Sequence, residues 1–424
     1  MNIWLITVGE PLPIDIGNQR LYRTGILAKM LGENGHNVTW WTSSVNHMTK
    51  KQRSSKNTGT NLNDKYQIKI IYSIIYKKNI SLSRIINHYL TAKKFAKWAS
   101  QEQTPDIILC SFPTLSLSAE AVRFGKLKNI PVVLDIRDLW PDIFVGLVPV
   151  WAKKWARLVL NPAFRFSRLA CKNANAIFGI TPAFVDWGIS RGERQKCALD
   201  RDFPLAYSDT TPGQDSKQEA KAFWFQKGLR SDNSDFNVCF FGTIGQQFEL
   251  GTVIKAAKIV QSHNKHIKFI LCGTGDKLAF YENMASDCFN IVFPGWVQSH
   301  HIWTLMRLSC IGLAPYHSSE DFMKSLPNKS LEYLSAGLPI VSSLKGTLQE
   351  LLEDNNCGIT YENGNEEQLA EILFSLYEKP EILRTMSENA FALYQERFVA
   401  EKVYSDMIDH LELICKEYKR SGGK

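Results

Sequence analysis

The amino-acid sequence predicts an α/β protein built from two Rossmann-like domains, each with a parallel sheet covered by helices. Short runs of β-branched residues alternate with helix-length amphipathic segments in both halves of the chain. The chain has 424 residues, 44% of them hydrophobic, and a single hydrophobic core stops growing near roughly 250–300 residues. A polar stretch rich in Ser, Asp, Gly and Lys, from Tyr207 to Asp235, separates the two halves. We therefore expect one domain over residues 1–205 and a second over residues 235–400.

The expected strands are short β-branched runs separated by segments of helix length. In the first half they are Ile3–Val8, Val38–Thr42, Ile68–Tyr72, Ile107–Cys110, Val132–Asp135 and Ala176–Ile180. In the second half they are Asn237–Phe241, Ile267–Cys272, Asn290–Phe293, Ile311–Ala314 and Pro339–Val341. The last segment of the chain is amphipathic, which predicts a helix over residues 403–424 that packs back onto the first domain.

The cysteine content and the N-terminal sequence indicate the cellular compartment in which the protein works. The nine cysteines are scattered, odd in number and without C-x-x-C spacing, which is typical of a reduced intracellular protein without a metal framework. The N-terminus lacks the basic region and long apolar stretch of a signal peptide. The sequence contains no run of about 18 uncharged apolar residues, so we do not expect a membrane-spanning helix. We expect a cytoplasmic protein that is soluble, or peripheral at the inner face of the membrane.

The net charge of +8 has a local origin. Between Lys50 and Lys97 there are twelve Lys or Arg residues against one acid, Asp64, and aromatic residues lie among them. A second basic and aromatic segment, Val150–Leu169, contains Trp151 and Trp155. An anionic membrane surface attracts such segments. The alternative for Lys50–Lys97 is a solvated basic loop and helix face. The alternative for Val150–Leu169 is a pair of ordinary surface helices whose aromatic residues face the core. Together the two segments favour membrane docking, and no motif indicates nucleic acid.

The segment from Leu326 to Val341, LPNKSLEYLSAGLPIV, carries the strongest sign of chemistry. Asn328 is placed to cap a helix whose first-turn N–H groups form an anion site, and Lys329 adds a cation beside it. A diphosphate fits there. One turn later, Glu332 is placed to accept the hydroxyls of a ribose, as acidic residues do in dinucleotide sites. The alternative is an ordinary strand-helix-strand unit in which Glu332 faces solvent.

Three strand-to-loop junctions precede this segment. Each ends a buried strand in glycine, which lets backbone N–H groups approach phosphate. The junction residues that we assign to binding a phosphate-bearing donor molecule are Gly242, Thr243, Gly245, Gly273, Gly275 and Trp296. Each signal is weak alone, and their order along the chain gives them weight.

The first half offers two candidate segments. The loop with Gly17, Asn18 and Arg20 leads into a helix that begins near Arg23, and both arginines either contact phosphate or are ordinary exposed residues. The segment Leu134–Asp142, LDIRDLWPD, ends a buried strand in charged groups that are costly to place together. Asp138 is the candidate acid or base that faces an acceptor, with Arg137 orienting it. The alternative is a structural network of the two that only shapes the loop.

The segment from Leu326 to Val341 resembles the donor-binding helix of retaining GT-B glycosyltransferases of family 4, and LDIRDLWPD is similar to a segment of the family's bacterial fucosamine-type transferases. The resemblance implies that Glu332 binds the ribose. Lys324 stands where the family pattern has its first Glu. Gln246 and Gln247 stand near the place where many family members have an Arg and a Lys that hold the diphosphate, so Lys329, with Lys324, neutralises more of its charge. It also implies two domains that face each other across a cleft, a retaining reaction, and neither a metal ion nor another cofactor.

The implied activity is transfer of a hexosyl or N-acetylhexosaminyl group from a nucleotide-diphosphate sugar, most simply a UDP-sugar. The implied acceptor is a lipid-linked saccharide in the synthesis of a surface polysaccharide such as O-antigen or capsule, and the catalytic candidates are Asp138, Arg137 and Lys329. One alternative is a nucleotide-sugar epimerase of the same architecture. Another is a catalytically silent nucleotide-sugar-binding subunit, suggested by Lys324 and by Gln246 and Gln247 in the phosphate loop.

Overall fold

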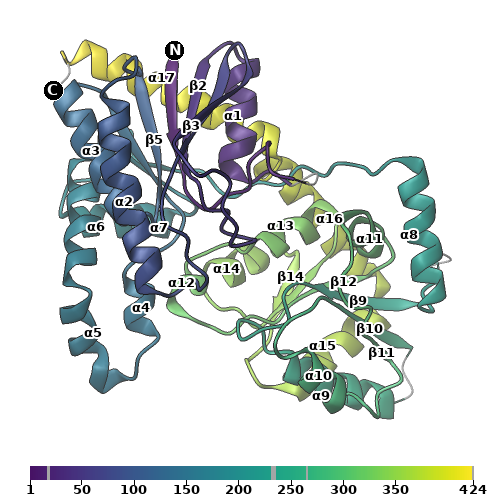
Figure 1. Cartoon of the computed structure of the whole chain (residues 1–424). Helices are drawn as coiled ribbons and strands as arrows, with labels where there is room; N and C mark the ends of the chain where they lie inside the picture. Colours follow the sequence, from purple (N-terminus) through teal and green to yellow (C-terminus); the bar gives the residue numbers. More distant parts are fainter. Residues whose placement is uncertain (17–19, 231–234, 264–265, 423–424) are drawn as a thin grey trace. The chain divides into compact units, whose positions relative to one another are not determined.

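The computed structural model describes residues 1–16, 20–230, 235–263 and 266–422. The chain folds into two compact units (Figure 1). The first comprises residues 1–204 and 401–424, and the second comprises residues 205–400. The C-terminal helix α17 (Ala400–Arg420) therefore completes the first unit. Its Tyr404 ring lies 5.8 Å from the Arg23 guanidinium, and its His410 ring packs on Phe178 and Phe203.

The first unit contains an eight-stranded sheet in the order β3-β4-β2-β1-β5-β6-β7-β8. All neighbouring strands are parallel except β3 and β4. Six expected strands are confirmed, and two, β3 and β8, were not expected. The strands are β1 (Asn2–Ile6), β2 (Asn37–Ser43), β3 (Thr58–Asn63), β4 (Tyr66–Ile71), β5 (Ile107–Phe112), β6 (Val132–Ile136), β7 (Ala176–Gly179) and β8 (Arg201–Asp202).

Helices cover both faces of this sheet. Helices α2, α3, α6 and α7 pack against one another in a row, whereas α1 lies with α17 on the opposite side (Figure 1). The helices are α1 (Arg23–Glu33), α2 (Leu82–Ala99), α3 (Leu115–Lys128), α4 (Asp142–Gly146), α5 (Lys153–Val159), α6 (Asn161–Asn173) and α7 (Pro182–Gly192), with a 3₁₀ turn η1 at Val150–Ala152.

Two aromatic residues of the basic segment Lys50–Lys97, Tyr66 and Phe95, belong to the core rather than to the surface. Phe95 packs edge-on against Trp41, with ring centroids 5.3 Å apart. Tyr66 lies in β4 and Phe95 in α2. Alternation explains their burial, because aromatic residues that flank cations in sequence point to the other face of a strand or helix.

The second unit contains a six-stranded parallel sheet in the order β11-β10-β9-β12-β13-β14. All five expected strands are confirmed, and the short edge strand β14 was not expected. Strand β9 (FNVCFF) is buried at every position, as parallel strands covered on both faces are. The strands are β9 (Phe236–Phe241), β10 (Ile267–Cys272), β11 (Ile291–Val292), β12 (Ile311–Ala314), β13 (Ile340–Ser342) and β14 (Gly358–Thr360).

Helix α9 packs with α10 and α15, α8 packs with α11, and α13 packs with α16. The helices are α8 (Gln214–Gln226), α9 (Leu250–Ser262), α10 (Leu278–Met284), α11 (Ser299–Arg307), α12 (Glu320–Met323), α13 (Asn328–Ser335), α14 (Thr347–Asp354), α15 (Glu366–Glu378) and α16 (Pro380–Arg397). No helix in the described part of the chain has the length and apolar character needed to span a membrane.

The stretch expected to be a connection between domains is partly a built element of the second unit. Its helix α8 buries Trp224, whose indole N–H donates to the carbonyl of His301 at 2.9 Å. The sequence did not predict that Trp224 is buried, because a single Trp is a weak signal in a segment rich in Ser, Asp and Lys.

Candidate functional site

The strand order of the second unit reverses direction between β9 and β12. In open α/β sheets, ligands bind beyond the carboxyl ends of the strands at such a reversal. A pocket of about 230 Å³ lies beside the carboxyl ends of β9 and β10. It is lined by Phe241, Gly242, Thr243, Cys272, Gly273, Thr274, Trp296, Val297, Ile302 and Lys329. Five residues assigned to donor binding from the sequence meet here: Gly242, Thr243, Gly273, Trp296 and Lys329.

Two loops close the base of this pocket by direct backbone contact. The Gly242 N–H donates to the Cys272 carbonyl at 3.0 Å, and the Ile244 N–H donates to the Thr274 carbonyl at 2.9 Å. A Cβ at Gly273 would overlap the Gly242 carbonyl oxygen, and one at Gly275 would overlap the carbonyl oxygen of Ile244. These glycines are required because backbone approaches backbone. Gly245 and Gly275 thus belong to the loops that support the pocket wall.

Lys329 brings a positive charge to these loops. It lies in the first turn of α13, and a Cβ at Gly242 would touch its ammonium group, so the charge lies over the glycine loop. The ammonium nitrogen is 4.9 Å from the centre of the Phe248 ring and 5.3 Å from that of Phe240. Burial lowers the pKa of Lys329 to about 8, and the carboxylate of Glu332 opposes this change. The side chain remains mostly charged at pH 7.

Glu332 lies one helical turn beyond Lys329, on the same face of α13. Its exposed fraction is 9%, so the alternative in which it faces solvent is wrong. Burial, with the charge of Glu332, raises the pKa of Tyr316. A buried carboxylate thus lies one helical turn from the ammonium group that lines the pocket, which suits recognition of hydroxyl and phosphate groups on one ligand.

The predicted capping role of Asn328 is wrong. Pro327 is the N-cap, with φ −64° and ψ 143°, and no side chain caps the helix. Asn328 is the first helical residue and is exposed. Proline fixes the entry angle of the chain and thereby moves the start of the helix by one residue. Lys324 is the half-buried C-cap of α12, in the loop that precedes α13.

The first unit holds a buried network of charges at the carboxyl ends of β1 and β6. Arg23 donates to both oxygens of Asp135, at 2.9 and 3.0 Å, and Arg137 donates to Asp135 at 2.7 Å. Arg137 also pairs with Glu10, which accepts the Thr24 hydroxyl at 2.6 Å. The expectation that Arg23 contacts phosphate is wrong, because Asp135 and the Pro204 carbonyl already hold its guanidinium.

Arg137 and Asp138 point into different surroundings. Arg137 serves the buried carboxylates of Asp135 and Glu10, whereas Asp138 is exposed. The charge that faces Asp138 belongs to Arg84, at the start of α2. The Arg84 guanidinium stacks on Trp140 at 4.8 Å. The structure thus supports a structural role for Arg137, whose partner is Asp135 rather than Asp138. Asp138 does not belong to this buried network and lies at the surface.

A cluster of cationic and aromatic groups, which the sequence did not single out, surrounds Tyr76 near Asp138. The Tyr76 hydroxyl lies 2.8 Å from Nδ1 of His47, and the ammonium of Lys50 lies 3.4 Å from the same nitrogen. Burial, then Arg84 and Lys50, lowers the pKa of His47 to about 4. Burial and Arg84 lower the pKa of Lys50. We call His47, Lys50, Tyr76 and Arg84 the cationic cluster.

The structure does not define a site around the remaining loop residues that were assigned to the acceptor side. Arg20 is exposed, and Gly17 and Asn18 lie outside the described residues.

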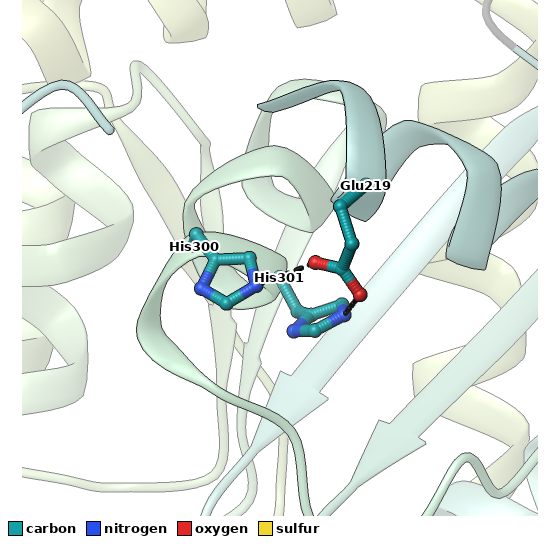
Figure 2. Close-up of side chains that lie close together, drawn as sticks. All are labelled: Glu219, His300 and His301. Carbon is teal, nitrogen blue, oxygen red and sulfur yellow. Dashed lines mark hydrogen bonds and ion pairs between the residues drawn. The ribbon is translucent and has the colours of Figure 1, made fainter. Parts of the chain in front are cut away.

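One group of possible metal ligands occurs in the described part of the chain. Glu219 of α8 meets His300 and His301 of α11, as Figure 2 shows. The sequence analysis predicted no metal site, and it missed this group because Glu219 is separated from His300 by 81 residues. The adjacent histidines were the available signal.

Two parallel-sheet units, the second with a glycine-loop pocket beyond its strands, define the GT-B class of fold. Residues 223–393, which lie within the second unit, match the family model described as "Glycosyl transferases group 1". The amylovoran biosynthesis glycosyltransferase AmsK of Erwinia amylovora is 29% identical over 133 residues, or 30% of this chain. That match spans about a third, 32%, of the relative's length.

Solved structures resemble nearly the whole chain. Sucrose-phosphate synthase from Thermosynechococcus elongatus has a TM-score of 0.68 and 15% identity, covering 97% of this chain and 98% of that one. Anabaena HepE in complex with UDP has a TM-score of 0.65 and 15% identity, covering 97% and 100%. HepE is also described in complex with UDP-glucose, with a TM-score of 0.64. At these identities the likeness shows the fold.

Proposed function

We propose that this protein is a retaining glycosyltransferase. It transfers a sugar from a nucleotide-diphosphate sugar, most simply a UDP-sugar, to a lipid-linked acceptor in the synthesis of a cell-surface polysaccharide. The observation that carries the proposal is the arrangement of Lys329 over the glycine loop with Glu332 one turn away. The HepE structures, which are complexes with UDP and with UDP-glucose, and the amylovoran relative support the donor and product classes.

The donor site follows from these groups. The Lys329 charge and the first-turn N–H groups of α13 attract the diphosphate, and they stabilise the negative charge that develops on it as the sugar departs. Glu332 accepts hydrogen bonds from the ribose hydroxyls. Trp296, 70% exposed at the pocket wall, offers a ring face to the base. No step in this scheme requires a metal ion.

Calorimetric titration with UDP-, GDP- and dTDP-sugars, without magnesium, tests the donor site. We expect one nucleotide class to bind, and Glu332→Ala to weaken that binding by about tenfold or more, since it removes hydrogen bonds to a charged group. The control is Glu350→Ala, a change at an exposed residue of α14 in the same unit. Failure of every nucleotide to bind would contradict the proposal.

The two rival functions predict different outcomes with the same protein. An epimerase interconverts nucleotide sugars in the absence of any acceptor. A silent binding subunit binds the nucleotide sugar and forms no product with any acceptor. Transfer of radiolabelled sugar to a polyprenyl-linked acceptor, with no change in the donor when the acceptor is omitted, separates the proposed transferase from both.

The surface of the first unit supports a lipid-linked acceptor. Helix α5 has no buried residue, and Trp151 and Trp155 are 79% and 68% exposed. Nearby Val150, Leu158 and Val159 are exposed as well. We call Val150, Trp151, Trp155, Leu158 and Val159 the apolar tip. Lys153, Lys154 and Arg157 accompany it, so apolar and cationic groups project from one short segment, as in helices that lie on anionic membranes.

The start of α2 has the same character. Ile80, Leu82 and Ile85 are exposed there, with Lys77 and Lys78 just before them. Arg84 in this first turn belongs to the cationic cluster, where three basic side chains gather around Tyr76. The phosphate of a lipid-linked acceptor relieves the mutual repulsion of the Lys50 and Arg84 charges. The cationic cluster thus supplies the phosphate end of the acceptor side, and Asp138 is the candidate acid or base.

The double variant Trp151→Glu/Trp155→Glu is expected to lower partition onto vesicles that contain phosphatidylglycerol by at least about tenfold. Burial of one large apolar side chain contributes about 1.5–3 kcal/mol. Co-sedimentation with vesicles measures the effect. The matched control is Phe225→Glu/Phe289→Glu, which changes two exposed aromatic residues of the second unit. Equal loss in both double variants would show that general surface hydrophobicity, rather than the apolar tip, binds the membrane.

A further inference from the structure

Three side chains from two helices of the second unit converge at one point. His300 and His301 lie in the first turn of α11, and Glu219 lies in α8. Nε2 of His300 is 2.6 Å from one oxygen of Glu219, and Nε2 of His301 is 3.1 Å from the other. Figure 2 shows both rings turned toward the same carboxylate, and the three ligand atoms all lie within 4.8 Å of one another.

We propose that Glu219, His300 and His301 bind a divalent transition-metal ion of the Zn²⁺ class, with water in the fourth position, and that this ion joins α8 to α11. Two imidazoles and one carboxylate are ligands that suit Zn²⁺, whereas Mg²⁺ and Ca²⁺ prefer oxygen alone. The site is separate from the proposed donor chemistry and does not depend on it.

The geometry needs a movement of less than an ångström at Glu219 to hold the ion. Bonds of about 2.0–2.1 Å at tetrahedral angles place ligand atoms about 3.3 Å apart. The contacts of Glu219 with the two histidines are 2.6 and 3.1 Å, so they widen by about 0.7 and 0.2 Å. Glu219 can supply this movement, because its side chain is 56% exposed. The histidine side chains are more enclosed, at 18% and 8% exposed.

The packing around His301 holds its ring in place for coordination. A metal ion binds the neutral imidazole through a ring nitrogen. The His301 ring is fixed between Phe223, at 4.5 Å, and Trp224, at 6.4 Å between ring centres. This packing orients the ring toward Glu219.

The ion would reinforce a junction that already matters to the unit. Helix α8 is the first helix of the second unit, and Trp224 donates to the His301 carbonyl from it. The next residue of α11, Ile302, lines the pocket beside Gly242 and Lys329. Metal binding thus stiffens the helix that forms one wall of the pocket. The competing interpretation is a hydrogen-bonded Glu–His–His cluster that needs no ion.

Calorimetric titration of the chelator-treated full chain with Zn²⁺ tests the site. We expect about one equivalent to bind with a dissociation constant near or below ~10 μM, a higher melting temperature with Zn²⁺, and no comparable effect of Mg²⁺. Glu219→Gln and His300→Ala should each weaken binding by about tenfold or more. These positions are preferred to His301, whose burial makes substitution a risk to folding.

Two variants control for adventitious binding. His266→Ala removes an exposed histidine of the same unit, and Cys197→Ser removes the exposed thiol, so neither should change the affinity. The proposal is overturned if no Zn²⁺ binds stoichiometrically, or if binding persists unchanged in both Glu219→Gln and His300→Ala. Nucleotide titration of the same variants keeps this result distinct from the fate of the proposed transferase.

Discussion

Replacing Lys329 by methionine is expected to lower kcat/KM for sugar transfer by about 10²–10³-fold, the cost of removing one donor that stabilises developing charge. Lys329 is the cation that the structure places over the glycine loop, and its ammonium group lies within 5.5 Å of the centres of three phenylalanine rings. Methionine keeps the volume and removes the charge. Initial rates with the donor identified by titration measure the loss.

Lys345→Met is the matched control, because Lys345 lies in the same unit and pairs with Glu362 at the surface. We expect it to keep nearly full activity. If Lys329→Met retained wild-type kcat/KM, Lys329 would have no part in stabilising the leaving group. Nucleotide affinity is measured in parallel, so that a loss of binding is distinguished from a loss of rate.

The pH dependence of nucleotide binding follows from the same residue. Burial lowers the pKa of Lys329 to about 8, and Glu332 opposes the shift. Since a diphosphate binds the charged form, its affinity is complete below about pH 7 and falls as pH rises through 8, by up to tenfold per pH unit. Lys329→Met should bind more weakly and lack this fall.

The second large effect is on stability. Asp135→Asn is expected to destabilise the first unit by about 3–5 kcal/mol, because it leaves buried guanidinium groups without their charge partner. Asp135 is fully buried and accepts three hydrogen bonds from Arg23 and Arg137. Scanning calorimetry should show a lower melting temperature for the transition of the first unit.

Asp406→Asn provides the control within the same unit. Asp406 pairs with Arg201 at 2.6 Å, and both side chains are about half exposed, so its loss should cost less than about 1 kcal/mol. Equal melting temperatures for the two variants would contradict the stabilising role of the buried network.

Acid should affect the same network. Burial alone raises the pKa of Asp135, but Arg137 and Arg23 hold that pKa below its ordinary value of 3.8. A carboxyl group with a lowered pKa in the folded state contributes stability that is fully present above the unfolded pKa. That contribution is lost as pH falls through the folded pKa, so the network keeps part of it below pH 3.8.

Most of the parallel strands could be predicted because each is a mainly apolar run. The three missed strands lack that signal: β3 (TGTNLN) is polar and mostly exposed, β8 has two residues, and β14 has three. Edge strands with few apolar side chains draw their stability from one neighbour, so the local sequence says little about them.

The candidate site was predictable to different degrees in the two units. Lys329 and Glu332 stand three residues apart on one helix, and local spacing alone places them on one face. Arg23 was misassigned because its partner Asp135 lies 112 residues away. The cationic cluster and the Glu219 site likewise join loops or helices that only the tertiary fold brings together.

Helix α17 has a consequence for how the chain is made. Val403, Tyr404, Met407, Leu411 and Ile414 of this last helix are buried in a unit whose other residues all precede Leu205. At ~5–20 residues per second, a ribosome adds the intervening residues in roughly ten to forty seconds. During that time α17 is not yet available to cover the apolar surface on which it packs in the first unit. The second unit precedes α17 in the chain, so it can finish folding before the first unit is complete. Chaperones that shield nascent chains therefore have a defined surface to protect.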